Sequence, residues 1–382
     1  MKIIRTATIP ESLAVLLKGQ LRFLSNYFDI IGIASNGKAL HEVEKNEGVR
    51  TIPVDMQRGI SPFKDFISLI NLYKKFKQEK PIIVHSITPK AGLLTMLAGK
   101  MAGVPIRMHT FTGLIFPTRT GFIQKLLINM DRLLCWAATN IYPEGNGVKS
   151  NLISYKITSK PLKVLANGNV NGINLTHFNP EIYSDFDSTA FRKSLNIKPN
   201  DFVFIFVGRL VGDKGINELV KAFSTLSNAN VKLLLVGPFE SELDPLKKET
   251  LEEIDDNKNI ISVGFQKDVR PYFVISDSLV FPSYREGFPN VVIQAGAMEL
   301  PSIVTNISGC NEIIVEGKNG TIIPIKNVEA IQAAMLKMIE DKDNYNKLKT
   351  NTRPMIQSRY QQQVVWNALL EEYNLLISKL SN

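Results

Sequence analysis

The 382-residue sequence is poor in the residues that build disulfide scaffolds, metal sites and membrane spans. Its two cysteines, Cys135 and Cys310, lie far apart without metal-ligand spacing, so we expect no disulfide framework and a reducing compartment. No apolar run reaches about 18 residues, because Asp131 and Arg132 interrupt the longest candidate. The N-terminus also lacks the apolar segment of a signal peptide. We therefore expect a cytoplasmic protein that does not span a membrane.

The length and composition are typical of a folded protein with two α/β domains of similar size. Apolar residues make up 44% of the chain and charged residues 21%. The net charge of +9 is uneven, since residues 1–178 hold 23 Lys and Arg against 10 Asp and Glu, whereas residues 179–382 hold 22 against 26. This asymmetry indicates that the first half faces an anionic partner, and the alternative is an ordinary solubilising surface.

Short apolar runs alternate with longer helical patterns, which predicts parallel sheets covered by helices on both faces. The predicted strands are Lys2–Ala7, Ile30–Ala34, Ile82–Ser86, Ile106–Thr110, Asn140–Tyr142, Phe202–Val207, Val231–Val236, Ile260–Val263, Leu279–Phe281 and Ser302–Thr305. The predicted helices are Ser12–Asn26, Phe63–Lys77, Lys90–Ala102, Gly215–Leu226, Leu246–Glu253, Val291–Glu299, Val328–Ile339 and Gln361–Lys379.

A stretch rich in Gly and Asn, residues 167–174, marks the boundary between two halves. We predict an N-terminal Rossmann-like domain over 1–170, a C-terminal one over 171–355, and a helix within 356–382 that packs back across the junction. The fold class is then α/β, with two doubly wound domains facing a central cleft at the carboxyl ends of their strands.

The segment FIFVGRLVGDKGI, residues 204–216, has the features of a diphosphate site. An apolar strand ends at Val207, Gly208 opens a turn, and Arg209 and Lys214 precede a helix. Two cations and the free N–H groups of a helix start favour an anion there. Two exposed loop cations are the alternative.

The segment FPSYREGFPNVVIQAGAMELPSIV, residues 281–304, places an acid beside a helix start. Glu286 lies in a tight loop, and Pro289 stands at the helix entry, where its missing N–H costs nothing. A carboxylate here can accept hydrogen bonds from sugar hydroxyls. It can also simply complement the helix dipole.

Together the two segments resemble the donor domain of glycosyltransferase family 4, retaining enzymes of GT-B fold, including those of capsular and O-antigen polysaccharides. The matching residues are Gly208, Arg209, Lys214, Gly215, Glu286, Gly287, Phe288 and Pro289. Gln294 stands where the family has a second glutamate that grips the nucleotide ribose, so a weaker ribose bond is expected.

The resemblance implies that Arg209 and Lys214 stabilise the leaving diphosphate and that Glu286 holds the donor sugar. It also implies that Val263 and Phe265 contact the base through backbone groups. Further substrate contacts are implied for Gly208, Gly287, Phe288, Pro289 and Asn290. No metal and no cofactor is expected, and a UDP-sugar is the donor substrate.

The first half resembles polysaccharide-assembling relatives over residues 85–92. Lys90 at a helix N-terminus is a candidate anion contact, and His85 a candidate substrate contact. Relatives often carry a histidine immediately before Gly113, where this chain has Thr112. His109, three residues earlier, is the candidate catalytic histidine, and Thr112 is the alternative contact.

The resemblance implies an EC 2.4 retaining transferase that moves a sugar, here guessed to be an N-acetylhexosamine, to a polyprenyl diphosphate-linked glycan. The amphipathic segment Phe122–Ala137 and the basic run at residues 74–80 predict a peripheral position on anionic lipid at the inner face of the cytoplasmic membrane. An inward-packed helix and an ordinary solvated helix end are the alternatives.

Three other functions stay open at this point. A non-catalytic sugar-nucleotide or glycan-binding protein fits the departures at Gln294 and Thr112. An enzyme like UDP-N-acetylglucosamine 2-epimerase shares the fold, but its acids and histidines have no counterparts here. A nucleic-acid binder fits the charge but lacks interleaved aromatics or a known binding module, so no nucleic-acid partner is expected.

Overall fold

The structure is a computed structural model that describes residues 1–57, 59–226, 230–240, 242 and 244–381. The chain folds as two compact units. Unit 1 combines Met1–Gly172 with Gln362–Asn382, and unit 2 is Ile173–Gln361. The predicted domain boundaries, after residues 170 and 355, differ from these by a few residues.

Unit 1 contains a six-stranded parallel sheet with the order β3-β2-β1-β4-β5-β6. The strands are β1 (Lys2–Thr6), β2 (Asp29–Ala34), β3 (Arg50–Pro53), β4 (Ile83–Ser86), β5 (Ile106–Phe111) and β6 (Asn140–Pro143). The order reverses between β1 and β4, which is the doubly wound topology, and ligands bind in such sheets at the carboxyl ends of the strands beside the reversal.

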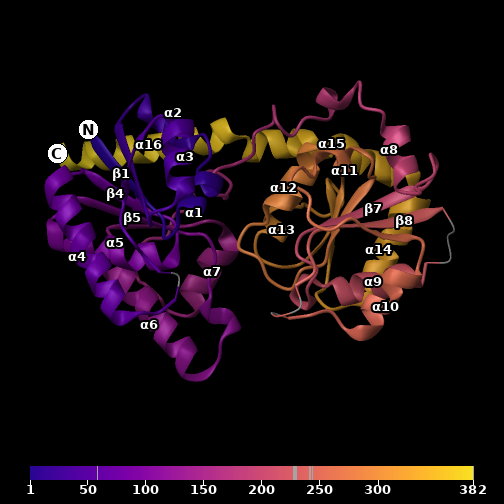
Figure 1. Cartoon of the computed structure of the whole chain (residues 1–382), viewed down its shortest axis with the longest axis horizontal. Coiled ribbons are helices and arrows are strands. Elements are labelled where there is room, and N and C mark those ends of the chain that lie inside the picture. Colours follow the sequence, from indigo (N-terminus) through magenta and orange to yellow (C-terminus); the bar gives the residue numbers. More distant parts are fainter. Residues whose placement is uncertain (58, 227–229, 241, 243, 382) are drawn as a thin grey trace. The chain divides into compact units, whose positions relative to one another are not determined.

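Helices cover both faces of this sheet and bury two separate cores (Figure 1). One face carries α1 (Pro10–Leu16), α2 (Gln20–Ser25), α3 (Lys38–Glu47) and α16 (Gln362–Ser381). The other carries α4 (Pro62–Glu79), α5 (Pro89–Ala102), α6 (Gly121–Ala137) and α7 (Asn146–Ser154). Helix α16 belongs to unit 1 because Tyr373, fully buried, packs into the core of the first face.

Unit 2 repeats the topology with the order β12-β11-β10-β7-β8-β9. The strands are β7 (Phe202–Val207), β8 (Val231–Val236), β9 (Ile260–Ser262), β10 (Ser278–Phe281), β11 (Ser302–Thr305) and β12 (Gly320–Ile323). Strands β7 and β8 are nearly continuous apolar runs because both faces of a parallel sheet are buried. The reversal falls between β7 and β10.

The helices of unit 2 also lie on both faces of the sheet (Figure 1). One group is α9 (Ile216–Ser224), α10 (Lys248–Asp256) and α14 (Val328–Glu340), and the other is α11 (Arg270–Val274), α12 (Asn290–Ala297), α13 (Cys310–Ile313) and α15 (Lys342–Tyr360). Helix α8 (Ser188–Ser194) precedes the sheet. Short 3-10 helices are η1 (Phe116–Thr118), η2 (Pro180–Tyr183) and η3 (Gly212–Lys214).

The structure differs from the prediction at one predicted helix and at two strands that were not predicted. The single helix predicted over Ser12–Asn26 is two helices, α1 and α2, because Gly19 adopts a left-handed conformation with φ of 80°. Strands β3 and β12 were not predicted. Both are edge strands with partly exposed side chains, so neither carries the apolar run of a central strand.

Candidate functional site

The two motif loops follow the two strands at the reversal point of unit 2. Gly208 and Arg209 come directly after β7, and Glu286 lies in the loop after β10. Because β7 and β10 are neighbouring parallel strands, both loops emerge at the same sheet edge. The topology alone therefore brings together segments about 70 residues apart at the position where doubly wound sheets bind ligands.

Backbone contacts fasten the two loops to each other. The Tyr284 N–H donates to the Asp213 carbonyl at 2.9 Å. Gly215 is left-handed, with φ of 74°, and an added Cβ would lie 2.2 Å from the Pro282 carbonyl oxygen. Glycine is required at position 215 for both reasons, since a side chain would force the loops apart.

Lys214 and Glu286 meet in an ion pair between these loops. Their side chains are 17% and 16% exposed, so the pair is partly shielded from water. Ser283 donates a hydrogen bond from Oγ to Glu286 Oε1 at 2.9 Å, and the Lys214 ammonium lies 5.7 Å from the centre of the Phe281 ring. The two predicted residues, Lys214 and Glu286, thus lie in one site, and Ser283 and Phe281 contact them there.

Cys310 lies close enough to this ion pair for both charges to affect the pKa of its thiol. Burial raises the pKa of the Cys310 thiol well above its ordinary value, the Glu286 carboxylate adds to this rise, and Lys214 opposes it. The loop before α13 also touches the acidic loop, because an added Cβ on Gly309 would lie 2.6 Å from the Gly287 carbonyl oxygen. Cys310 is buried and neutral, so it packs beside the pair as an apolar group.

Arg209, the second predicted cation, forms an ion pair with a different carboxylate at the same edge of the sheet. Its Nη1 forms an ion pair with Glu240, in the loop after β8. The Arg209 side chain is 49% exposed and that of Glu240 31%. Arg209 and Lys214 therefore lie on the same loop after β7, but each is paired with a carboxylate of a different loop.

The rest of the acidic motif forms the entry to α12. Phe288 is buried and packs edge-on against Tyr360 at 5.6 Å, which anchors the loop. Pro289 is the N-cap residue and Asn290 begins the helix. Gln294, one turn further along α12, is partly buried. The residues of the acidic motif from Glu286 to Asn290 therefore form the entry to α12, and Gln294 lies in its second turn.

In the loop after β9, the backbone groups of Val263, which were predicted to contact the base, already have partners within the protein. The Val263 N–H donates to Leu235 at 3.0 Å, and the Val263 carbonyl accepts from Gln266 Nε2 at 2.7 Å. Both polar groups of Val263 thus already have a partner, but its carbonyl oxygen keeps a second lone pair, so the contact with the base stays a prediction. The Phe265 side chain is 73% exposed and lies free at the end of this loop.

His109, the candidate catalytic histidine, is a core residue of unit 1. Its ring is buried against Phe111, and its Nδ1 forms a 2.8 Å hydrogen bond with Ser86 Oγ. An added Cβ on Gly92 would lie 2.4 Å from the ring, so α5 closes over it. Burial lowers the pKa of His109 to about 3. This position does not fit the predicted contact with a substrate.

The other predicted residues of unit 1 are also tied to internal partners. Lys90 is buried and ion-paired with Asp65 at the start of α4, so its predicted anion contact would require breaking this pair. Thr112 donates from Oγ1 to the Ile87 carbonyl at 3.1 Å. Thr112 is only partly buried, and it is the more accessible of the two candidates near Gly113.

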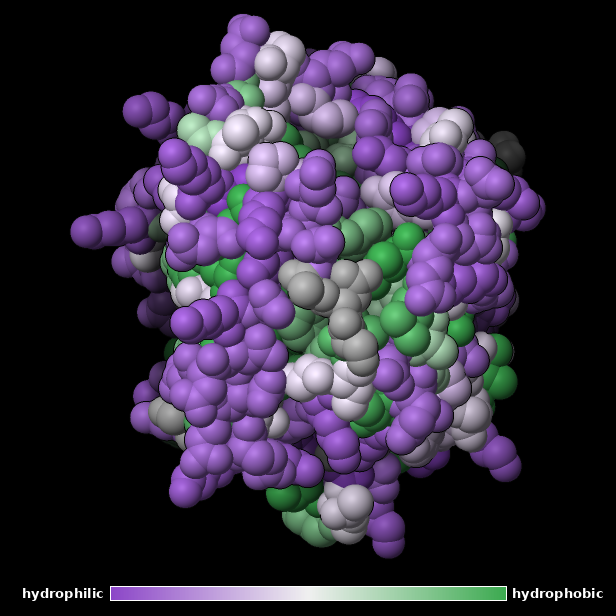
Figure 2. Space-filling model, turned by 90° about the vertical axis from the view of Figure 1, so that its right-hand side faces the viewer, coloured by the Kyte–Doolittle hydropathy of each residue, from purple (hydrophilic) through white to green (hydrophobic). Residues whose placement is uncertain are grey.

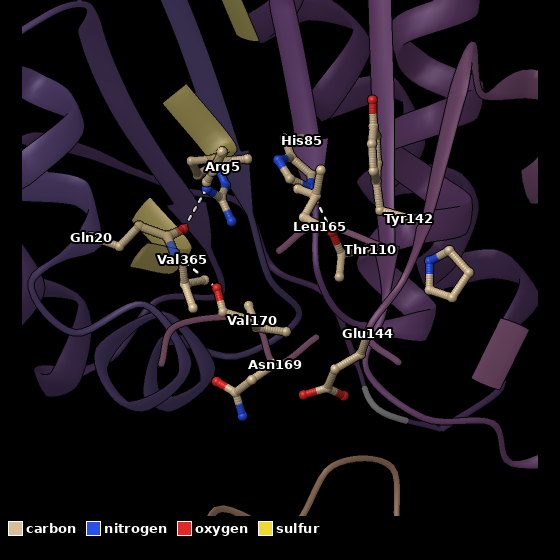
Figure 3. Close-up of a pocket in the computed structure, with 12 residues that line it drawn as sticks. Arg5, Gln20, His85, Thr110, Tyr142, Glu144, Leu165, Asn169, Val170 and Val365 are labelled. Carbon is tan, nitrogen blue, oxygen red and sulfur yellow. Dashed lines mark hydrogen bonds between the residues drawn. The ribbon is translucent and has the colours of Figure 1, made fainter. Parts of the chain in front are cut away.

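His85 lies in a buried polar network that joins the sheet to α16. Its Nδ1 and Nε2 each form a 2.8 Å hydrogen bond, to Tyr373 and Thr110. Figure 3 shows that Arg5, His85 and Thr110 line a cavity between them. The cavity measures about 20 Å³, room for about one water molecule. The network therefore links α16 to the sheet of unit 1, and a sugar does not fit in its cavity.

Several residues of the site were missed by sequence reasoning. Ser283 and Asp213 lie inside the two motif segments but were given no role, and Glu240 lies outside both segments. Their contacts join loops that only the folded sheet brings together. Within the described residues, no group of three or more His, Cys, Asp or Glu could hold a metal ion.

The topology of both units, with the motif loops at the reversal point of unit 2, defines a protein of two doubly wound, Rossmann-like domains. Residues 187–355 match the family of glycosyl transferases group 1, and residues 11–144 match the glycosyl transferase 4-like family. The capsular polysaccharide biosynthesis glycosyltransferase CapM of Staphylococcus aureus is 32% identical, over 99% of this chain and 98% of that protein. The chain belongs to this family of glycosyltransferases, and the predicted family and fold are confirmed.

Two further comparisons support the assignment. The UDP-Gal:alpha-D-GlcNAc-diphosphoundecaprenol alpha-1,3-galactosyltransferase of Escherichia coli is 29% identical, over 75% of this chain and 73% of that protein. The crystal structure of Anabaena HepE in complex with UDP superposes with a TM-score of 0.80 at 16% identity, covering 98% of this chain and all of that chain. The last likeness concerns the fold.

Proposed function

We propose that this glycosyltransferase moves a sugar from a UDP-sugar, with retention at the anomeric carbon, to a lipid-linked glycan during surface polysaccharide assembly. The observation that carries this proposal is the meeting of Lys214 and Glu286 at the reversal point of unit 2, beside Arg209. The E. coli relative is named for a UDP-galactose donor and a diphosphoundecaprenol acceptor, and CapM for capsular polysaccharide.

The chemistry follows from the charges on these loops. As the bond between the anomeric carbon and UDP breaks, negative charge grows on the diphosphate, and Arg209 and Lys214 stabilise it. Such preorganised charges usually supply the largest share of rate enhancement. Glu286 accepts hydrogen bonds from the donor sugar hydroxyls. The acceptor hydroxyl attacks from the face that the diphosphate leaves, and a departing phosphate oxygen takes its proton, which gives retention.

The donor sugar is proposed to be an N-acetylhexosamine. The test is to incubate the purified chain with UDP-GlcNAc, UDP-GalNAc, UDP-glucose and UDP-galactose, and to measure UDP release with and without a lipid diphosphate-linked sugar. We expect release that rises with the acceptor, and the anomeric configuration of the product then tests retention. Saturable UDP binding with no release from any donor would favour the non-catalytic sugar-nucleotide binder.

We also propose that unit 1 rests on an anionic membrane, where such an acceptor would lie. Helix α6 exposes Phe122 at 79% and Ile123 at 55% in its first turn. Helix α4 does the same with Phe63 at 76% and Phe66 at 61%, a cluster that the sequence analysis missed. Exposed large apolar side chains that gather in this way mark interaction surfaces.

The two clusters lie at the same edge of unit 1. Helices α4 and α6 each lead from the carboxyl end of one parallel strand back to the start of the next, so their first turns emerge at one edge, on either side of α5. Lys64, Arg119 and Lys125 are exposed nearby and suit anionic headgroups. Figure 2 shows a face of unit 2, on which hydrophilic residues surround a band of hydrophobic ones. No helix within the described residues is long and apolar enough to cross a membrane.

Vesicle sedimentation tests this surface. The chain should bind vesicles of phosphatidylglycerol and phosphatidylcholine better than vesicles of phosphatidylcholine alone. Replacing Phe63 and Phe66 together by Ser should lower binding about tenfold or more, since each removes a large apolar side chain from the lipid. Val15→Ser, at a 68% exposed position of α1 on the other face of the sheet, is the matched control. Equal loss in both variants would contradict the proposal.

A further inference from the structure

Glu240 occupies a position next to the proposed diphosphate site that no motif explains. It lies in the loop after β8, and its carboxylate pairs with Arg209. Among the described residues, Glu240 is the acidic residue whose carboxylate forms an ion pair with Arg209. An acid in contact with a cation that is to bind a diphosphate competes with the ligand for the same N–H donors.

The backbone builds this contact into the fold. The Leu210 N–H donates to the Pro238 carbonyl at 2.9 Å, and Leu210 forms a bridge with Phe239. Gly237 approaches the preceding loop so closely that an added Cβ would lie 1.8 Å from the Gly208 carbonyl oxygen. The loops after β7 and β8 therefore run side by side over several residues, and this register places Glu240 opposite Arg209.

The pair is suited to exchange. Arg209 and Glu240 are both substantially exposed, and exposed pairs contribute little to stability because water and salt screen them. A diphosphate offers two charged groups and bidentate geometry to the same guanidinium. Ligand binding can thus displace Glu240 without disturbing the core, whereas the more buried pair of Lys214 and Glu286 is held by further contacts.

We propose that Glu240 is a positioning residue of the donor site: it holds the Arg209 guanidinium in the free enzyme and gives way to the diphosphate of the nucleotide. This inference rests on the proposed function. Because Glu240 competes with the diphosphate for the Arg209 guanidinium, it weakens binding of the donor and of the product UDP. Release of UDP after transfer is correspondingly easier, because the Glu240 carboxylate replaces the departing diphosphate at the Arg209 guanidinium.

Calorimetric titration of the full chain with UDP and with uridine tests the inference. Glu240→Gln removes the competing charge and keeps the shape, and it should tighten UDP binding about two- to fivefold, the range set by an exposed ion pair. The KM for the donor should fall by a similar factor. Uridine affinity should not change, because uridine carries no phosphate. A residue with only a structural role would weaken both ligands when replaced.

Glu242→Gln is the matched control, since it removes the same charge from an exposed position in the same loop. Its UDP affinity should stay within about 1.5-fold of the parent, and high salt should reduce the effect of Glu240→Gln. If the parent binds UDP and the two variants behave alike, Glu240 does not compete with the diphosphate and the inference is wrong. If neither the parent nor Glu240→Gln binds UDP, the donor assignment falls together with it.

Discussion

Both predicted cations of the donor site are already paired with carboxylates of unit 2, but in different environments. The pair of Lys214 and Glu286 is shielded and joined by Ser283, whereas Arg209 is half exposed. A charge in a shielded place acts on a transition state more strongly, because less water screens it. Lys214 should therefore contribute more to turnover than Arg209 does.

Replacing Lys214 by Ala should lower turnover at least about 100-fold, as the loss of a preorganised transition-state charge does. Arg209→Ala should act in the same direction. The measurement is initial UDP release at saturating donor and acceptor. Lys221→Ala, an exposed lysine of α9, serves as the control and should retain parental activity. Turnover within threefold of the parent for both Lys214→Ala and Arg209→Ala would remove the diphosphate assignment.

The buried His109 gives unit 1 a pH-dependent stability. Because burial holds its pKa at about 3, the folded state binds no proton there at mild acid, whereas the unfolded chain takes one up below about pH 6.5. The unfolded state then binds more protons, so stability falls as the pH drops from 6.5 toward 3. Between pH 7.5 and 5 this single group lowers the free energy of unfolding by about 2 kcal/mol.

His109→Asn should therefore reduce the loss of stability between pH 7.5 and 5 by about 2 kcal/mol relative to the parent, even if the variant is less stable overall. The free energy of unfolding is measured at the two pH values, by calorimetry of thermal unfolding or by denaturant unfolding monitored by circular dichroism. Burial raises the pKa of Asp131 to about 7, which acts in the opposite direction, but Asp131 is present in both proteins and cancels in the comparison. His41→Asn, at an exposed position of α3, should keep the parental pH dependence.

At the scale of elements, the site depends on turns that let two loops approach. Gly215→Ala should lower turnover more than 100-fold, because the new methyl group collides with Pro282 and separates Lys214 from Glu286. Gly317→Ala is a matched control, since Gly317 is also left-handed, with φ of 68°, but no atom lies within 4 Å of its added Cβ. That variant should lose only about 1 kcal/mol of stability and keep its activity. Equal losses of activity in Gly215→Ala and Gly317→Ala would indicate that the left-handed backbone strain, and not the collision with Pro282, causes the effect.

The strands show which elements a sequence can predict. Central strands such as β7 and β8 are buried on both faces, so their apolar runs predicted the observed bounds without error. The edge strands β3 and β12 pair on one side only and keep polar or half-exposed residues, so their patterns resemble loops. The break at Gly19 was missed for a similar reason, since a helical period continues across a turn that only the backbone conformation reveals.

At the scale of the molecule, the chain returns to unit 1 after completing unit 2. Helix α16 buries Tyr373, whose hydroxyl contacts Arg5 at 3.2 Å and His85 at 2.8 Å. A chain that ends at Gln361 should therefore retain a folded unit 2 and lose stability in unit 1. Calorimetry of this shortened chain should show two unfolding transitions. Only the midpoint temperature of the unit 1 transition should be lower than in the parent. Tyr373→Phe keeps the helix and removes the hydroxyl, and it should cost about 1–3 kcal/mol in unit 1 alone.

The sequence by itself determined the family, the two doubly wound sheets and the motif residues Arg209, Lys214 and Glu286, because apolar periodicity and motif spacing are local properties of the chain. It did not determine which side chains meet. His109 has the sequence context of a substrate contact but is covered by α5, and Glu240 has no motif but lies against Arg209. Only the tertiary structure decides such contacts, since burial and pairing between loops depend on how strands distant in sequence are ordered in the sheet.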